Sequence, residues 1–174
     1  GGKILEGDYS QLEFRVAGFL ANDEQVLKDI KNKVDVHSYT AKILGVSRQK
    51  AKSDTFKPLY GGILGTPKQM QYYRAFKNKY SGITRWHTEL QNEALMSSKI
   101  RLPSGRQYFF PNVERLRSGS VTNSTAIKNY PVQGFATADL LPLALINLNK
   151  LLTKNELKSI VCNTVHDSIV LDVY

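Results

Sequence analysis

The chain has 174 residues, of which 41% are hydrophobic and 22% are charged, and its excess of basic residues gives a formal net charge of +9. These values exclude a disordered chain and fit one domain, or two intimate subdomains, with a buried core. The positive charge favours an anionic partner such as nucleic acid, although a basic surface that only promotes solubility would give the same charge.

The single cysteine and the apolar runs bear on where the protein works. Cys162 stands alone, which excludes an internal disulfide and fits a reducing cytoplasm, and its apolar surroundings predict an inert core thiol. No apolar run approaches a membrane span and no signal peptide is visible, so we expect no membrane partner. Because the chain starts with Gly and ends directly after a predicted strand, we expect an excerpt of a longer protein.

The first part of the chain predicts one strand and then helices. A short apolar run from Lys3 leads to Asp8 and predicts a strand that ends near that residue. From Gln11 onward, apolar residues recur at helical spacing. The next two predicted helices have as their N-caps Asn22 and Asp35, and as their ends Ile30 and Gly45.

The next segment, RQKAKSDTFKPLYGG, carries Arg48, Lys52, Phe56 and Tyr60 at every fourth position. Residues four apart lie on one face of an α-helix. Two cations followed by two aromatic rings indicate a nucleotide, with phosphates against the cations and a base against the rings. The alternative is an ordinary amphipathic helix with solvated basic residues, and periodicity alone does not decide between them. Pro58 lacks an N–H inside this helix, so we expect a bend between Phe56 and Tyr60.

The remainder of the chain predicts helices, a hairpin and two final strands. Thr66–Pro67 is a strong start signal for a helix that runs to Lys79. The further predicted elements are a helix marked by Ile83 to Ala94, a β-hairpin near 100–110, a polar loop over 115–122, a helix from about 123 to 152 that Pro131 should kink or divide, and strands at 159–165 and 168–173. Only His166 and Asp167 separate these strands, which predicts the shortest common hairpin connection.

Two aspartates stand at strand ends, Asp8 after the first strand and Asp167 at the tip of the last hairpin. Phosphoryl transfer from a nucleoside triphosphate needs in-line positioning and cations that absorb charge. Mg²⁺ takes hard oxygen ligands, usually one or two carboxylates with waters and substrate phosphates. The two aspartates would supply such ligands if the fold brought them together. By themselves, they are more simply explained as turn-forming residues.

Four segments resemble, in order along the chain, motifs of the family A DNA polymerases, the bacterial repair and phage replicative type. They are DYSQLEFRV at 8–16, Arg-x-x-x-Lys-x-x-x-Phe-x-x-x-Tyr-Gly at 48–61, NYPVQG at 129–134 and VHDSIVLDV at 165–173. One such match often arises by chance, whereas four in the family's order very rarely do. The resemblance spans essentially the whole chain.

The resemblance implies an α+β fold, with predominantly helical fingers inserted in a small antiparallel β palm. Residues 1–20 would belong to the palm, 21–122 to the fingers with a nucleotide-binding helix at 48–61, and 123–174 to the palm with a long helix and the catalytic hairpin. The implied activity is template-directed DNA synthesis from deoxynucleoside triphosphates on primer-template DNA, in the cytoplasm, or in the host cytoplasm for a phage protein. A processivity factor of unknown kind would be a further partner. Thumb and exonuclease would lie outside this chain, so we expect the excerpt alone to extend primers weakly or not at all.

The resemblance also assigns roles residue by residue. Asp8, Asp167 and the backbone carbonyl of Tyr9 would bind two Mg²⁺ ions, while the primer 3′-oxygen attacks the α-phosphorus. Arg48, Lys52 and His37 would bind the triphosphate, and Lys52 would also protonate the departing pyrophosphate. The remaining assignments are Phe56 under the sugar and base, Tyr60 at the templating position, Gln11 at the nucleotide, Glu13 blocking a ribose 2′-hydroxyl, Asn129 and Gln133 in the DNA minor groove, and Arg15 and His166 near the primer. Without the resemblance, a lone histidine is more often structural and an exposed Glu at a helix start needs no special role.

Several residues depart from the family pattern and point to a phage-like branch. Lys57 replaces a small residue of bacterial members, Ser168 follows the last aspartate where many members carry Glu, and Thr125 stands where bacterial members often carry Arg. The segment QGFATAD is one residue longer than the usual QGTAAD, which predicts a bulge in the helix near Phe135. Two alternatives remain open: a single-subunit RNA polymerase, which Glu13 disfavours, and a non-catalytic, basic nucleic-acid-binding module.

Overall fold

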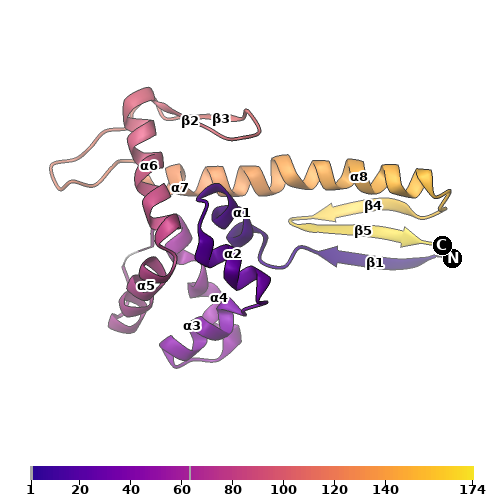
Figure 1. Ribbon diagram of the computed structural model, residues 1–174, viewed down its shortest axis with the longest axis horizontal. Coiled ribbons are helices and arrows are strands. Elements are labelled where there is room, and N and C mark those ends of the chain that lie inside the picture. The colour runs from indigo at the N-terminus through magenta and orange to yellow at the C-terminus, as the bar shows by residue number, and fades with distance from the viewer. Residues whose placement is uncertain (1, 63) are drawn as a thin grey trace. The chain divides into compact units, whose positions relative to one another are not determined.

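The computed structural model describes residues 2–62 and 64–174, and the chain divides into two compact units. The sheet unit joins the two ends of the chain, Gly1–Glu13 and Gln133–Tyr174, and the helical unit is Phe14–Val132. The described residues form helices and two small antiparallel sheets (Figure 1), which confirms the expected α+β class. The boundaries between the units lie between residues 13 and 14 and between residues 132 and 133, so most of the helix at 12–20 and nearly all of the helix at 124–133 belong to the helical unit.

The sheet unit is built on three antiparallel strands in the order β1-β5-β4. They are β1 (Lys3–Asp8), β4 (Ile160–Val165) and β5 (Ser168–Val173), close to the three strands that the sequence predicts at the two ends of the chain. His166 adopts a left-handed backbone with φ 55° in the two-residue turn between β4 and β5, which confirms the predicted hairpin. The pairing of β1 with β5 therefore places the first and last segments of the sequence side by side.

One long helix, interrupted in its backbone pattern, lies in both units. It consists of α7 (Ser124–Gln133), a π-helical segment (Gly134–Leu140) and α8 (Leu141–Lys154), which runs alongside β4 (Figure 1). A π-helix accommodates one extra residue within a helix, so this segment confirms the bulge predicted near Phe135. Pro131 stays inside α7 without ending it, because the helix continues for two more residues to Gln133 before the π-segment begins.

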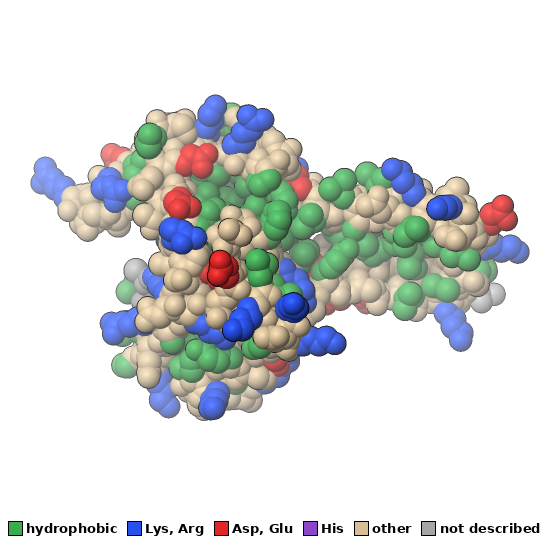
Figure 2. Space-filling model, in the orientation of Figure 1, with side chains coloured by type: hydrophobic (Ala, Val, Ile, Leu, Met, Phe, Trp, Pro, Cys, Tyr) green, Lys and Arg blue, Asp and Glu red, His purple; other side chains and the backbone are tan. Residues whose placement is uncertain are grey.

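The helical run Ser124–Lys154 corrects the expectation that no segment resembles a membrane span. By length and composition it could cross a bilayer: its most apolar window has a mean hydropathy of 1.3, and only 17% of that window is buried. Core helices of soluble proteins meet the same criterion, which makes it weak support for a membrane. Figure 2 shows hydrophobic side chains gathered over α8 and the sheet, where Leu143, Ile146 and Leu151 are exposed.

The helical unit contains the remaining elements, most of which begin and end where the sequence predicts. They are α1 (Leu12–Leu20), α2 (Glu24–Lys31), α3 (Val36–Leu44), α4 (Arg48–Thr55), the 3₁₀ segment η1 (Lys57–Tyr60), α5 (Pro67–Lys79), α6 (Ser81–Ser97) and the hairpin β2 (Lys99–Arg101) with β3 (Gln107–Phe109). Asp35 accepts N-cap hydrogen bonds as predicted, Ser47 caps α4, and Thr66 forms a capping box with Gln69.

An aromatic cluster forms the core of the helical unit. The rings of Phe14, Phe76 and Tyr80 are at most 1% exposed, and their centroids are separated by 4.7 to 6.5 Å. Tyr80 donates its hydroxyl hydrogen to Asp29 at 2.9 Å, so its polar end is satisfied inside the core. Asp29 also pairs with Lys79 at 2.7 Å, which ties α2 to the end of α5.

Three sequence predictions were wrong in this fold. Asn22 does not cap α2, because the buried Asp23 accepts from the N–H of Val26 and also from that of Ile83, bonds that join α2 to α6. The predicted helix over 48–61 is not continuous, since α4 ends at Thr55. Cys162 is exposed, because β4 is an edge strand whose register with β5 shifts between Val161 and Asn163.

Candidate functional site

The two predicted metal-binding aspartates lie together in the sheet unit. The β1–β5 register places Asp8 directly opposite Ser168, and the N–H of Tyr9 donates to the backbone carbonyl of Asp167 at 3.2 Å. The carboxyl groups of Asp8 and Asp167 share a hydrogen bond, and the pKa of Asp8 is raised, first by partial desolvation and then by repulsion from Asp167 and, more weakly, Glu6. Two carboxyl groups this close favour a shared proton or a bound cation.

Asp8 lies at the end of β1, beside a hollow between the sheet and α8. Leu5 and Gly7 line a hollow of about 300 Å³ with Leu148 of α8, and Asp8 and Tyr9 at the end of β1 line it as well. Asp8 is itself exposed. The pair is therefore open to a large anionic substrate.

Ser168 is a further oxygen beside the pair. As the cross-strand partner of Asp8 it points to the same face of the sheet, and its hydroxyl is buried without a hydrogen-bond partner among the described residues. Part of the donor set for a divalent cation is thus two carboxylates and a hydroxyl, all hard oxygens. No group of three or more His, Cys, Asp or Glu side chains suited to a metal occurs among the described residues, so any cation here would rely on substrate oxygens and water as well. The residues present fit a magnesium ion held in this way.

The basic-aromatic segment of the helical unit is split by Pro58 into two pieces. Phe56 is the C-cap of α4, and η1 carries Pro58 as one of its first residues. The change to 3₁₀ geometry after Phe56 confirms the bend expected before Tyr60. Arg48 and Lys52 therefore share a face of α4, whereas Phe56 caps that helix and Tyr60 ends the tighter 3₁₀ helix.

Arg48 is held by an acidic residue that the sequence reasoning assigned only to capping. Its Nε lies 2.6 Å from Asp35 Oδ2, and both side chains are more than one third exposed. The Arg48 guanidinium, together with bonds from Ser38, keeps the pKa of Asp35 far below its usual range. The same carboxylate caps α3 through the N–H groups of His37 and Ser38. Arg48 is thus positioned by α3.

His37 lies beside both predicted phosphate-binding cations. Burial lowers its pKa, Asp35 opposes this shift, and Arg48 and Lys52 add to it, which places all three charges close to the imidazole. Its Nδ1 is 3.0 Å from Thr55 Oγ1. Because the Thr55 hydroxyl donates to the carbonyl of Ala51 at 2.8 Å, it accepts from His37, and Nδ1 carries the proton. The structure therefore brings His37, Arg48 and Lys52 into one basic cluster.

Phe56 is fixed by two rings that no spacing pattern had linked to it. It stacks on the buried Phe14 with 5.8 Å between centroids and an interplanar angle of 22°, and its ring meets that of His37 at 5.1 Å. Phe14 lies between Glu13 and Arg15 in α1, so α1 directly supports the basic-aromatic segment. The signal that could have identified this contact is the burial expected of Phe14, flanked by two charged residues.

The other predicted residues lie at separate places. Gln11, Glu13 and Arg15 stand at the start of α1, where Gln11 adopts φ 55° and Arg15 is exposed. Asn129 and Gln133 lie one turn apart on α7, and the Oδ1 of Asn129 is buried without a described partner. Tyr60 ends η1 and is half-buried, and His166 is exposed at the tip of the β4–β5 hairpin.

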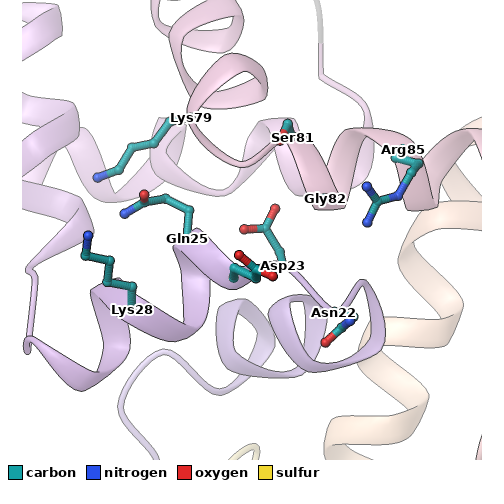
Figure 3. A pocket seen from close by; sticks show the side chains of 9 residues that line it. Asn22, Asp23, Gln25, Lys28, Lys79, Ser81, Gly82 and Arg85 are labelled. Atoms are coloured by element: carbon teal, nitrogen blue, oxygen red, sulfur yellow. The ribbon is translucent and has the colours of Figure 1, made fainter.

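A larger hollow in the helical unit contains none of the predicted residues. It has a volume of about 590 Å³ and lies between α2 and the start of α6, lined by Asp23, Lys28, Lys79 and Arg85 among others (Figure 3). Of its two acidic residues, Asp23 and Glu24, the first already accepts from two backbone N–H groups, and Lys79 is paired with Asp29. The hollow is therefore explained by helix packing.

Comparison with known proteins shows that the similarity to family A DNA polymerases covers the whole of this chain. The model of the DNA polymerase family A matches residues 1–174. The DNA polymerase I of Lactococcus lactis subsp. cremoris is 32% identical over 191 aligned residues, and that of Pseudomonas aeruginosa is 29% identical over 194. These alignments cover 98% and 99% of this chain but 22% and 21% of the relatives. The chain thus spans about a fifth of the length of the curated relatives it matches.

A solved structure has the same fold. The polymerase domain of Pol1 from M. smegmatis, in complex with a DNA primer-template and dNTP, superimposes with a TM-score of 0.80 at 22% sequence identity. The match covers 99% of this chain and 34% of that structure.

Proposed function

Because the chain belongs to DNA polymerase family A, we propose that it is the catalytic portion of a template-directed DNA polymerase and acts in the cytoplasm. Its substrates would be deoxynucleoside triphosphates and primer-template DNA, the partners named for the M. smegmatis structure. The sheet unit would serve as palm and most of the helical unit as fingers. The rest of the polymerase, including a thumb, would lie in a longer polypeptide. A phage origin stays a prediction, and the relatives named above are bacterial.

The observation that carries this proposal is the contact between the carboxyl groups of Asp8 and Asp167. Both carboxylates, with the Tyr9 carbonyl and the Ser168 hydroxyl beside them, would hold Mg²⁺, two ions by our prediction. Bound Mg²⁺ would supply charge neutralisation at the transferring phosphoryl group and activation of the primer oxygen. Ser168 would thereby provide an oxygen where many family members carry a carboxylate.

The helical unit would bind the incoming nucleotide. Lys52 and Arg48 would bind the triphosphate, and Lys52 would protonate the leaving pyrophosphate. His37 keeps its Nδ1 proton on Thr55, so it would bind the phosphates through Nε2 once that nitrogen has taken up a proton from water. Phe56, supported by Phe14, would pack under the sugar and base. Tyr60 would occupy the templating position.

The remaining assignments concern the sugar and the DNA. Glu13 and Gln11 would contact the nucleotide, with Glu13 excluding a ribose 2′-hydroxyl. Asn129 and Gln133, one turn apart on α7, would contact the minor groove, where shared acceptors allow a check of pair geometry. Arg15 and His166 would lie near the primer.

Primer extension by the full-length protein tests this proposal. We expect Asp8→Asn and Asp167→Asn each to lower the extension rate by at least about 10³-fold, since each removes a charged metal ligand. Asp172→Asn, the same change at the other end of β5, is the matched control and should extend primers normally. Normal extension by the Asp8 and Asp167 variants would instead favour a non-catalytic nucleic-acid-binding protein.

A further inference from the structure

A second basic cluster lies at the end of η1, apart from the residues assigned above. Lys128 of α7 lays its side chain against Gly61, so that a methyl group added at Gly61 would stand 2.8 Å from Nζ and 3.1 Å from Cδ. Gly61 also has φ 85°, a conformation that other residues rarely adopt. The absence of a side chain at Gly61 therefore leaves room for the Lys128 ammonium directly after Tyr60.

His87 of α6 completes the cluster with Lys77 of α5. His87 is only 7% exposed. Its side chain hydrogen-bonds to the backbone of Leu59, and its Nε2 has no hydrogen-bond partner among the described residues. Burial, and then the charge of Lys128, lowers the pKa of His87 to about 3, which leaves the ring neutral. Lys77 lies near enough to oppose the charging of both His87 and Lys128.

Among the residues that the structure describes, no acidic side chain is paired with these lysines. None of the ion pairs among the described residues includes Lys77 or Lys128, and both side chains are only half exposed. Burial lowers the pKa of each lysine, and no carboxylate counteracts this shift. Partly desolvated cations that repel one another, beside a buried nitrogen without a partner, are compensated when an anion binds between them.

The position of the cluster in the fold indicates which kind of anion it would bind. From Arg48, the first triphosphate-binding cation, the chain rises through α4 and η1 by roughly 20 Å before it reaches Gly61. This distance is longer than a triphosphate group, so one nucleotide cannot bind both places through its phosphates. The neighbour of Gly61 is Tyr60, which would hold the templating position. An anion beside a templating base is a phosphate of the template strand.

We propose that Lys128, Lys77 and His87 form a binding site for a phosphodiester of the single-stranded template, next to the templating base. The proposal rests on the polymerase function proposed above. His87 would accept a proton on Nε2 when the phosphate binds, and would then donate to it. The two lysines would supply the charge, and Gly61 the space.

Binding measurements on the full-length protein test this site. The probes are a fluorescent DNA hairpin with a 5′ single-stranded template overhang and the same hairpin with a blunt end, titrated at several salt concentrations. We expect Lys128→Gln and Lys77→Gln each to weaken overhang binding about 5- to 10-fold, to lower the salt slope by about 0.7, and to leave blunt-end binding unchanged. Lys31→Gln, the same change at an exposed position of α2, should bind both probes as the parent does.

A second measurement follows the His87 ring by NMR during addition of inorganic phosphate. We expect the His87 signals to shift in the parent chain and not in Lys128→Gln. Overhang binding that is equal in the parent and both cluster variants overturns the proposal. So does an equal loss with both probes, or phosphate binding without any preference for the overhang. Each of these results is separate from the effect of Asp8→Asn on primer extension, which decides the polymerase function itself.

Discussion

The imidazole of His37 and the hydroxyl of Thr55 lie 3.0 Å apart, and Thr55 donates its own proton to Ala51, so the hydrogen bond runs from histidine to threonine. Thr55 thereby determines which nitrogen of His37 is protonated. We predict that Thr55→Val, which keeps the shape and removes the acceptor that holds the Nδ1 proton of the phosphate-binding imidazolium, weakens triphosphate binding by about 1 kcal/mol, or roughly fivefold in Kd. Nitrogen NMR of His37 should show a mixture of tautomers. Thr55→Ser, which keeps the hydroxyl, should behave as the parent, and an unchanged tautomer in Thr55→Val would contradict the assignment.

The ion pair of Asp35 with Arg48 limits how freely that cation can bind phosphate. Asp35→Asn keeps an N-cap of similar quality for α3 and removes the charge that holds Arg48. We expect the KM for deoxynucleoside triphosphate to fall several-fold in steady-state extension assays, with little change in Tm. Ser47→Asn, a cap exchange of the same kind at α4, serves as the control. A higher KM in Asp35→Asn would mean that the carboxylate positions Arg48 for catalysis.

The raised pKa of Asp8 makes the fold sensitive to pH and to divalent ions. The native state holds its proton more strongly than the unfolded state, so stability is expected to decrease as the pH rises through the raised pKa. At neutral pH, Mg²⁺ at ten times its Kd should add about 1.4 kcal/mol of stability. Thermal unfolding with and without Mg²⁺ measures this effect. Asp8→Asn should raise Tm without the ion and abolish the Mg²⁺ response, whereas an equal response in both proteins would refute a site at Asp8.

His87 predicts an acid-labile helical unit. Its pKa of about 3 in the fold is below the ordinary 6.5, so the unfolded chain binds a proton that the folded chain excludes between these values. Stability should therefore be complete above pH 6.5 and fall by up to about 1.4 kcal/mol per pH unit below it. Denaturant unfolding at pH 7, 6 and 5 measures the slope. His87→Gln, which cannot be protonated, should reduce the slope, and an unchanged slope would exclude His87 as its source.

Glu13 separates a DNA polymerase from the RNA polymerase alternative. If it blocks a ribose 2′-hydroxyl, Glu13→Ala in the full-length protein should raise ribonucleotide incorporation by about 10²-fold or more while extension with deoxynucleotides continues. Parallel primer extension with the two nucleotide types measures the ratio. Glu24→Ala, at the start of α2, is a matched control for loss of a first-turn carboxylate. Unchanged discrimination in Glu13→Ala would remove this role from the residue.

Local signals predicted local structure well in this chain. Asp35, Ser47 and Thr66–Pro67 mark true helix starts, because capping depends on neighbouring backbone N–H groups alone. The bulge at the π-segment was predicted from the family resemblance instead, because QGFATAD is one residue longer than the usual QGTAAD. The N-cap of α2 was predicted wrongly. Asp23 caps this helix instead of Asn22, because its carboxylate also accepts a hydrogen bond from the N–H of Ile83, which is distant in the sequence.

Contacts between segments that are distant in the sequence could be predicted only from the family resemblance, and some could not be predicted at all. That Asp8 would meet Asp167 followed from motif order, and the strand register confirms their proximity. No periodicity relates Phe14 to Phe56, Asp35 to Arg48, or Lys128 to Gly61, since each pair joins different elements. Their roles depend on tertiary packing, which the sequence pattern of either partner does not contain.

The exposed edge strand β4 has a practical consequence. Cys162 is the single cysteine of the 174 residues, and it points outward where the β4–β5 register shifts. A maleimide dye or spin label would therefore attach at one defined place on the three-stranded sheet, without prior removal of other thiols. Labelled in this way, the unmodified sequence could report in solution on how the sheet responds when DNA and nucleotide are added.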